Sequence, residues 1–544
     1  MARTYIALCT VAVLALAIGP VPHARACGGF FCSSVPIDQA GENLVFAMEA
    51  DGSVTAHIQI LYTGPSETFA WILPVPSVPT ISVGTDALFQ QLGFATAPSF
   101  RLESRTEGTC RAAPECAVRS YGEAGAAFRD ASARADGGPV EVLSTGQVGP
   151  YETAVVTSTD GAALYTWLRD NGYDIPASAE PEITYYVSTG HAFVALRLQK
   201  DRDAGEIQPI VLHYASGEPC IPLRLTRIAA TPDMPVTAYF LAAQGVMSLE
   251  YPTVEPSLDD PSIWYGSPTA YLASVGAVVN ESGGRAFVNE YSGPVPALYL
   301  DLGVDLEPLR TVTSATAFVQ QVSVLLSGDS QLLSILERRI PPPPGVTSRD
   351  FFNCLARGCG LYDAYAAALA FDPSGTVDDL NAAIIEPRAD AQAMLARHTR
   401  ITRLFTVISP DEMTADPTFM ASASVPLTSN VHQATQVFEC SARYVAQDAP
   451  SRLDLPSGRT VRLAEGTPYP VSDNAWCRAH YGVDARTPGS PATPPGTDAA
   501  VGGGIGGGGG CAVAPHGDPG ALVVVLGALG AVTLARRRRG RDRG

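Results

Sequence analysis

The order of its periodic patterns most restricts what this chain can fold into. Short apolar runs about 12 residues apart, with Gly and Pro between them, predict antiparallel strands up to residue 241. Apolar residues then recur with the period of a helix over 314–338, 350–370 and 377–399. Strands followed by helices predict an α+β fold. Its N-terminal and central part would be rich in antiparallel β-structure, followed by a helical segment and a small disulfide-stapled β extension at 421–486.

Turn and capping residues locate several elements within this plan. Two alternating apolar runs joined at Asp51-Gly52 predict a hairpin over 44–62, with His57 on its solvent face. Helices are predicted over 85–92 and 160–171, each beginning with a capping side chain. Further strands are predicted at 183–188, 192–199, 207–214, 221–228 and 236–241.

The first 26 residues have the parts of an export signal. Arg3 precedes an uncharged apolar segment at 5–18, which is shorter than the ~20 residues of a membrane-spanning helix. The Ala-Arg-Ala sequence before residue 27 predicts cleavage by signal peptidase after Ala26, with Cys27 as the first mature residue. A retained N-terminal anchor and lipoprotein processing at Cys27 are the two alternatives.

Three features follow one another at the C-terminus. The glycine-rich segment 501–510 is a flexible spacer, and Cys511 follows it. Residues 521–535 are apolar but few for a permanent membrane span, and the arginines at 536–539 would stay on the cytoplasmic side. This layout resembles the MYXO-CTERM sorting signal of myxobacteria. The resemblance implies cleavage near Cys511 by a membrane-embedded sorting protease, and a plain C-terminal membrane anchor is the alternative.

Nine of the 11 cysteines lie between the two terminal signals, and an exported chain is expected to oxidise its thiols. They are Cys27, Cys32, Cys110, Cys116, Cys220, Cys354, Cys359, Cys440 and Cys477. Short intervening loops predict bridges between Cys27 and Cys32 and between Cys110 and Cys116, and Cys440 with Cys477 is the natural remaining pair. Five residues of helix rise about 7.5 Å, so Cys354 and Cys359 pair only if the helix breaks at Gly358 or Gly360. Otherwise each pairs elsewhere, and Cys220 is the candidate for a free thiol.

Charge disfavours one class of partner. The chain has a formal net charge of −18, and residues 27–511 alone carry −24 because both terminal segments are basic. Lys200 is the only lysine, and clusters of basic residues occur only at the termini. An acidic body of this kind repels phosphate backbones, so we expect no nucleic-acid partner.

No complete catalytic, cofactor or metal motif occurs in the sequence. Residues 188–191 do not form the nucleophile-elbow pattern, 281–284 are typical of a turn, and Asp411-Glu412 are typical of helix N-terminal carboxylates. Residues 372–379 do not fit a calcium loop and favour a turn with a helix cap, and Cys477 with His480 lacks the second half of a zinc site. We therefore assign no catalytic, cofactor-binding or metal-binding residue.

Several short motifs, in order over roughly 27–420, are similar to those of one bacterial family. They are CGGFFC at 27–32, FAWILPVP at 69–76, QVGPYE at 147–152, WLRDNGY at 167–173 with Ile175-Pro176, and TRLF at 402–405 with SPDEMT at 409–414. In these motifs the chain resembles the domain-of-unknown-function family 2330 (DUF2330), with a loop insertion at 107–139. The resemblance implies an exported, cysteine-containing protein and carries over no activity and no catalytic residue.

These features predict a protein exported to the cell surface or outer membrane of a Gram-negative bacterium, by way of a transient inner-membrane intermediate. Its parts would be a signal peptide at 1–26, the body at 27–420, the β extension at 421–486, a Pro/Gly-rich linker at 487–510 and the tail at 511–544. The expected partners are signal peptidase, the sorting protease and, through the tail, the membrane. A non-enzymatic module for envelope structure, adhesion or ligand binding is the favoured function, and an exported hydrolase with an unrecognised active site is the alternative.

The tail predicts a mature form that ends at Cys511. The Cys511→Ala variant should accumulate as uncut precursor in the inner membrane, because the arginines at 536–539 resist transfer across it. Membrane fractionation with intact-mass analysis would measure this, with Ala512→Ser as the matched control. A Cys511→Ala protein that reaches the surface at normal level and size would refute the sorting interpretation.

Overall fold

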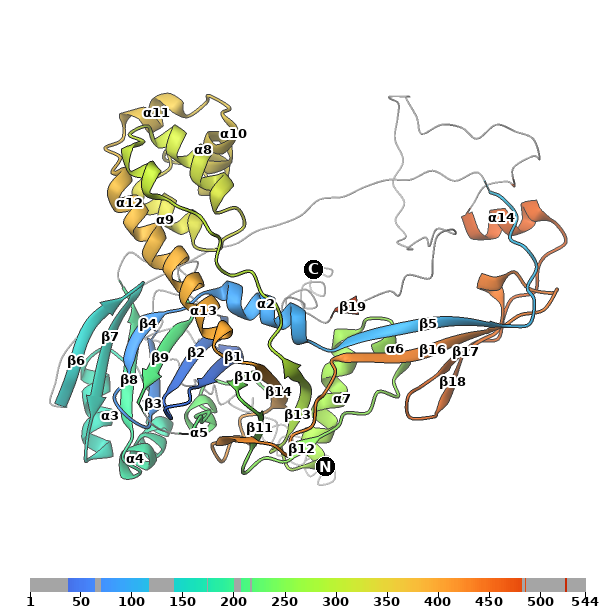
Figure 1. The fold of residues 1–544 in the computed structure, drawn as a ribbon, viewed down its shortest axis with the longest axis horizontal. Coiled ribbons are helices and arrows are strands. Elements are labelled where there is room, and N and C mark those ends of the chain that lie inside the picture. The colour runs from blue at the N-terminus through green and yellow to red at the C-terminus, as the bar shows by residue number, and fades with distance from the viewer. Residues whose placement is uncertain are drawn as a thin grey trace, which may run out of the picture.

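The computed structural model describes residues 38–63, 70–116, 141–173, 175–199, 207–215, 218–481, 485 and 524–525. Two facing β-sheets form the body, a helical lobe rises from it, and a long β-arm extends away from it (Figure 1). The predicted α+β class is confirmed. The predicted export signal with Ala26, Cys27 and Cys32 lies outside the described residues, and so does Cys511 with all of the predicted tail except Val524–Val525. Within them, no helix is both long and apolar enough to cross a membrane.

The large sheet has eight strands in the order β12-β13-β14-β10-β1-β2-β9-β4. Their bounds are β12 Thr253–Val254, β13 Phe287–Pro294, β14 Arg400–Ile408, β10 Met234–Ala242, β1 Asp38–Met48, β2 Val54–Thr63, β9 Ile210–Tyr214 and β4 Thr80–Val83. The predicted hairpin is β1 with β2, and Gly52 takes a φ of 85° in its turn. Most pairs are antiparallel as predicted, but β1 pairs with β10 in parallel, and so does β12 with β13.

A smaller sheet of four strands packs on the inner face of the large one, in the order β3-β8-β7-β6. Its bounds are β3 Ala70–Val75, β8 Ala192–Leu198, β7 Tyr151–Thr157 and β6 Glu141–Val148. Alternate side chains of the facing strands, such as Phe46 of β1 and Val194 of β8, enter one buried core. The outer face of the small sheet is covered by α3 (Gly161–Asp170), α4 (Glu180–Ser188) and α5 (Leu223–Thr226).

Helices also cover the outer face of the large sheet. They are α2 (Asp86–Thr96), α6 (Pro261–Trp264), α7 (Pro268–Glu281) and α13 (Glu386–Ala396). The helices predicted at 85–92 and 160–171 are confirmed as α2 and α3, with Thr85 and Asp160 as their caps. The prediction for His57 is wrong. It is 4% exposed because both faces of this sheet are covered, and burial lowers its pKa to about 4.

Two of the predicted strands are also wrong. Residues 183–188 belong to α4, which has Pro181 and two glutamates in its first turn and buries Ile183, Tyr186 and Val187. Their spacing is helical, so packing on the small sheet overrides the β-propensity of the local residues. Residues 221–228 contain the short helix α5, which follows Pro222 and buries Leu223 and Leu225.

The helical lobe consists of shorter helices than the sequence predicts. Its helices are α8 Ala315–Leu325, α9 Leu332–Arg339, α10 Ser348–Arg357, α11 Asp363–Ala368 and α12 Pro373–Leu380. Gly328 and Gly358 have φ values of 82° and 65°, and the predicted helices at 314–338 and 350–370 are interrupted there.

The side chain of Gln208 connects the base of the lobe to the two-sheet body. Between α12 and α13 the chain forms a π-helical turn at Asn381–Ile385. Pro387 has no N–H to donate to the Ala383 carbonyl, which an ordinary helix would require. That carbonyl instead accepts a hydrogen bond from Gln208 Nε2 at 2.8 Å, so the helix irregularity is also an anchoring point.

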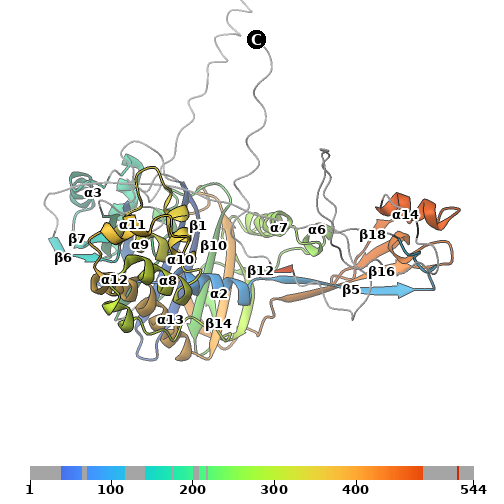
Figure 2. The same ribbon diagram turned by 90° about the horizontal axis from the view of Figure 1, so that it is seen from above.

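The arm is a third sheet with the order β18-β17-β16-β5-β19. Its bounds are β18 Thr460–Ala464, β17 Ser451–Asp454, β16 Val431–Glu439, β5 Ser99–Glu107 and β19 Val524–Val525. The parallel strands β5 and β16 extend far from the body, with α14 (Asp473–Tyr481) near their outer end (Figures 1 and 2). Next to β10, β13 and β14 of the large sheet, β11 (Gly245–Ser248) and β15 (Phe419–Ser422) form a separate two-stranded ribbon.

Two disulfides at the outer end of the arm correct the predicted local pairing. Cys110 bonds to Cys440, and Cys116 bonds to Cys477. The parallel pairing of β5 with β16 brings both strand ends together, so cysteines remote in sequence become neighbours. Residues 107–116, predicted to begin a loop insertion, are therefore joined to the extension at 421–486.

Of the two alternatives for Cys354 and Cys359, the structure shows the local bridge between them. Cys354 pairs with Cys359 because α10 ends at Arg357 and Gly358 adopts the left-handed conformation. Cys220 is free within the described residues.

The pairing in the arm predicts specific cross-linked peptides. Proteolysis without reduction should release the Cys110 peptide joined to the Cys440 peptide, and mass spectrometry would identify it. The Cys110→Ser/Cys440→Ser variant should lower the stability of the arm by roughly 2–4 kcal/mol, measured by hydrogen exchange in β16. Cys354→Ser/Cys359→Ser is the control and should leave that exchange unchanged. A peptide joining Cys110 to Cys116 would contradict the structure.

Candidate pocket between the two sheets

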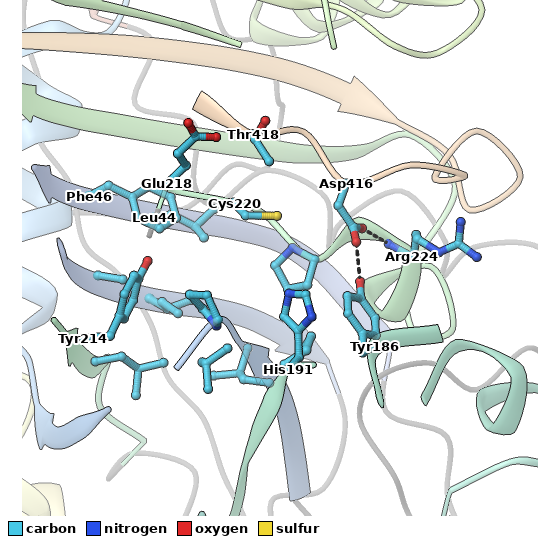
Figure 3. Close-up of a pocket in the computed structure, with 18 of the residues that line it drawn as sticks. Leu44, Phe46, Tyr186, His191, Tyr214, Glu218, Cys220, Arg224, Asp416 and Thr418 are labelled. Carbon is cyan, nitrogen blue, oxygen red and sulfur yellow. Dashed lines mark hydrogen bonds between the residues drawn. The ribbon is translucent and has the colours of Figure 1, made fainter. Parts of the chain in front are cut away.

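A pocket of about 540 Å³ lies between the two sheets, a size typical of small-molecule sites. Its apolar floor comes from alternate residues of three strands, which are Leu44 and Phe46 of β1, Ala56 and Ile58 of β2, and Leu73 and Val75 of β3. The opposite wall is polar and comes from the end of α4, the segment around Cys220, and residues 415–418 (Figure 3).

Asp416 organises the polar wall. Its carboxylate accepts hydrogen bonds from the Tyr186 hydroxyl at 2.8 Å and from the Arg224 backbone N–H at 2.9 Å (Figure 3). Burial raises the pKa of Asp416, and these two donors oppose the increase. The carboxylate therefore joins α4 to α5 across the wall of the pocket.

Arg224 is the one arginine among the residues that line the pocket, and its charge is already matched. The guanidinium donates to Glu182 Oε2 at 3.0 Å and to the Thr414 carbonyl at 3.1 Å. It also lies 4.0 Å from the centre of the Tyr185 ring, a cation–π distance. A strand was predicted over 221–228, whereas these residues contain the short helix α5, which places Arg224 at the pocket wall.

Cys220 and His191 line the same pocket, although neither has the environment of a catalytic group. Burial and the nearby carboxylates of Asp416 and Glu250 raise the pKa of the Cys220 thiol, which therefore stays protonated and weakly nucleophilic. Burial lowers the pKa of His191, whose Nδ1 lies 2.9 Å from the Thr189 hydroxyl. No hydrogen bond joins Cys220 to His191 within the described part of the chain.

Glu42 is a pocket residue that the sequence patterns did not single out. It shares the inward face of β1 with Leu44 and Phe46, and it is only 2% exposed. One carboxylate oxygen accepts a hydrogen bond from Gln39 Nε2 at 3.3 Å, and the other has no partner among the described residues. Burial raises the pKa of Glu42 to about 7. The sequence does contain a sign of this residue, because Glu42 is an acid on the apolar face of β1, just before the predicted hairpin over 44–62.

The other residues considered from sequence have structural roles. Asp411 and Glu412 lie in a turn and not at a helix start, and Glu412 accepts a hydrogen bond from the Ser409 N–H at 2.8 Å. Asp372 caps α12, as the turn-and-cap interpretation predicted. His480 lies 2.7 Å from Asp448, and Cys477 is in a disulfide. The described residues contain no group of three or more side chains suited to hold a metal ion.

Comparison with known proteins places this two-sheet body in a family. Residues 21–333, more than half of the chain, match the family described as an uncharacterized protein conserved in bacteria (DUF2330). The chain therefore belongs to the DUF2330 family, as its motifs indicated. No curated protein and no solved structure matches it significantly. The match includes the floor of the pocket and Arg224, whereas Asp416 and Thr418 lie beyond it.

Glu42 predicts a specific dependence of stability on pH. Its folded-state pKa of about 7 exceeds the ordinary 4.5, so its contribution to stability is complete below pH 4.5 and is lost as pH rises through 7. The loss is about 1.4 kcal/mol for each unit of pKa difference. Glu42→Gln should abolish this fall, measured by urea unfolding between pH 5 and 8.

Two comparisons isolate the effect of Glu42. His57 has the opposite dependence, because its lowered pKa makes the fold more stable as pH rises from about 4 to 6.5, so the measurement is a difference between variants. Glu255→Gln changes an exposed carboxyl and should follow the wild-type curve. Identical curves for Glu42→Gln and wild type would contradict the assignment.

Proposed function

We propose that this protein is an exported, surface-tethered binding module that holds a small molecule between its two sheets. The observation that carries the proposal is the pocket, in which an apolar floor faces a wall with a few converging polar groups. Rigid strands supply the floor, and the hydrogen bonds of Asp416 fix the wall, so much of the site is formed before a ligand enters.

Support for export comes from the chain outside the pocket. The sequence begins with the features of a signal peptide and ends with the spacer, Cys511, apolar segment and arginine cluster of a sorting tail. The disulfides in the arm and lobe are stable in an oxidising compartment. A tethered module would present its pocket and arm to the surroundings of the cell.

The alternative of an exported hydrolase has less support. A hydrolase that works through a covalent intermediate needs an activated nucleophile within hydrogen-bond reach of a base. The buried thiol of Cys220 has a raised pKa, and the nearest partner of His191 is the hydroxyl of Thr189. Among the described residues, the pocket therefore has groups for binding but no pair of side chains that would activate a cysteine nucleophile.

Cys220 offers a direct test of binding in this pocket. Because the thiol is weakly nucleophilic, N-ethylmaleimide is applied for hours at alkaline pH, where more thiolate forms. Molecules that bind in the pocket should slow this alkylation of Cys220 and raise the melting temperature of the mature protein. A screen of neutral, cationic and anionic small molecules would follow the Cys220 peptide by mass spectrometry. Alkylation at this position should then block binding of each hit.

The Cys220→Ser variant is the matched control. Treated with the same reagent, it should keep its affinity for the hits, because the serine hydroxyl is not alkylated and changes the pocket little. A screen in which no molecule protects Cys220 or raises the melting temperature would refute the proposed function. Hits that bind equally well to the alkylated wild type would place the site elsewhere.

A further inference from the structure

We infer that the pocket selects organic cations, namely small amines with an apolar body, an inference that rests on the proposed binding function. Several side chains that line the pocket titrate or carry charge, whereas β2 and β3 contribute only apolar residues. The titratable and charged groups are the carboxyls of Glu42, Glu218, Glu250 and Asp416, the guanidinium of Arg224, the imidazole of His191, the thiol of Cys220 and the phenols of Tyr185, Tyr186 and Tyr214.

Charge in this set favours a cation. Four carboxyls line the pocket against one arginine, and that arginine is paired with Glu182. Burial lowers the pKa of His191, so the imidazole adds no positive charge at neutral pH. Low-dielectric walls strengthen the attraction between the carboxyls and a cation, and they equally strengthen the repulsion of an anion.

Glu42 provides a specific contact for the positive charge of the ligand. Its second carboxylate oxygen lacks a described partner, although the side chain is 98% buried and lines the pocket. A buried carboxylate whose one hydrogen-bond donor is neutral is costly, and an ammonium group supplies both charge and N–H donors. A neutral ligand could donate a hydrogen bond to it but would leave its charge unmatched.

The remaining surfaces suit the apolar body of such a molecule. Phe46 and the aliphatic residues of the floor bury hydrocarbon, and tyrosine rings of the wall can face a cation. Arg224 already shows this contact, since its guanidinium lies over Tyr185. The carboxyls are too dispersed to form a metal site within the described residues, so an organic cation fits them better than a metal ion.

Binding of an amine should be coupled to loss of a proton. The contact needs Glu42 in its ionised form, whereas burial keeps the carboxyl partly protonated near neutral pH. Affinity for an amine should therefore increase as pH rises through about 7. An alcohol of the same shape should show no such increase, because it requires no ionised partner.

Three probes of one shape test the inference, namely phenethylamine, 2-phenylethanol and 3-phenylpropionate. Isothermal titration calorimetry with the mature protein should give at least tenfold tighter binding for the amine than for the other two. Titration in buffers of different ionisation enthalpy should detect proton release with the amine alone. Protection of Cys220 from alkylation would place the amine in this pocket.

Variants separate the role of Glu42 from general effects on folding. Glu42→Gln should weaken phenethylamine at least tenfold, abolish its proton release and leave 2-phenylethanol unchanged. Glu255→Gln should change none of these values, and the melting temperature of each variant would establish that it is folded.

The outcomes distinguish this inference from the proposed function. Equal or tighter binding of the alcohol or carboxylate would overturn the selection of cations but leave a binding pocket. Unchanged amine affinity in a folded Glu42→Gln protein would also overturn it. If none of the three binds, this inference fails, and the broader screen with Cys220 protection decides whether the pocket binds any small molecule.

Discussion

The contact between the inner faces of the two sheets is the interaction on which the rest of the structure depends. One continuous core joins strands of both sheets, and helices cover the outer face of each. The pocket is the unfilled part of the same contact, since Leu44, Phe46, Leu73 and Val75 belong to both the core and the pocket floor. The site therefore needs no separate scaffold. The pocket lies where side chains of the two facing sheets no longer contact each other. The core residues that line it are closely packed, so the pocket is as rigid as the core.

A second buried carboxyl shows why Glu42 stands out. Glu290 lies on the other side of the large sheet, where its oxygens contact Arg403 Nε at 2.5 Å and the Tyr271 hydroxyl at 2.7 Å. Arg403 also donates to the Tyr239 hydroxyl, so the buried charges satisfy one another. Glu42 is buried to a similar degree but has one neutral donor at 3.3 Å. A structural carboxyl is matched within the fold, whereas Glu42 has capacity left for something that enters the pocket.

Sequence reasoning succeeded where the information is local. The β1–β2 turn needs a residue that tolerates positive φ, and Gly52 supplies it, while Asp160 marks the start of α3 by capping it. It failed where distant segments decide. The disulfides follow from the pairing of β5 with β16, which no local pattern reveals. Likewise α4 is rich in residues that favour strands, and only its packing against the small sheet makes the helix preferable.

The pocket contains residues that local sequence patterns indicate and residues that only contacts between distant segments bring together. Counting cysteines singled out Cys220, because an odd number leaves one without a partner, yet the count says nothing of its surroundings. Asp416 and Tyr186 are 230 residues apart in sequence, and the hydrogen bond between them exists only after both sheets have formed. Glu42 is different, because the alternating pattern of its own strand already predicts which face of the sheet it lies on. A residue on the apolar face of a core strand is buried, and burying a carboxyl that no base in the fold matches costs free energy. An acid in such a register position, without a matching base, is therefore a local sign of a binding site, and it could be sought directly in a strand pattern.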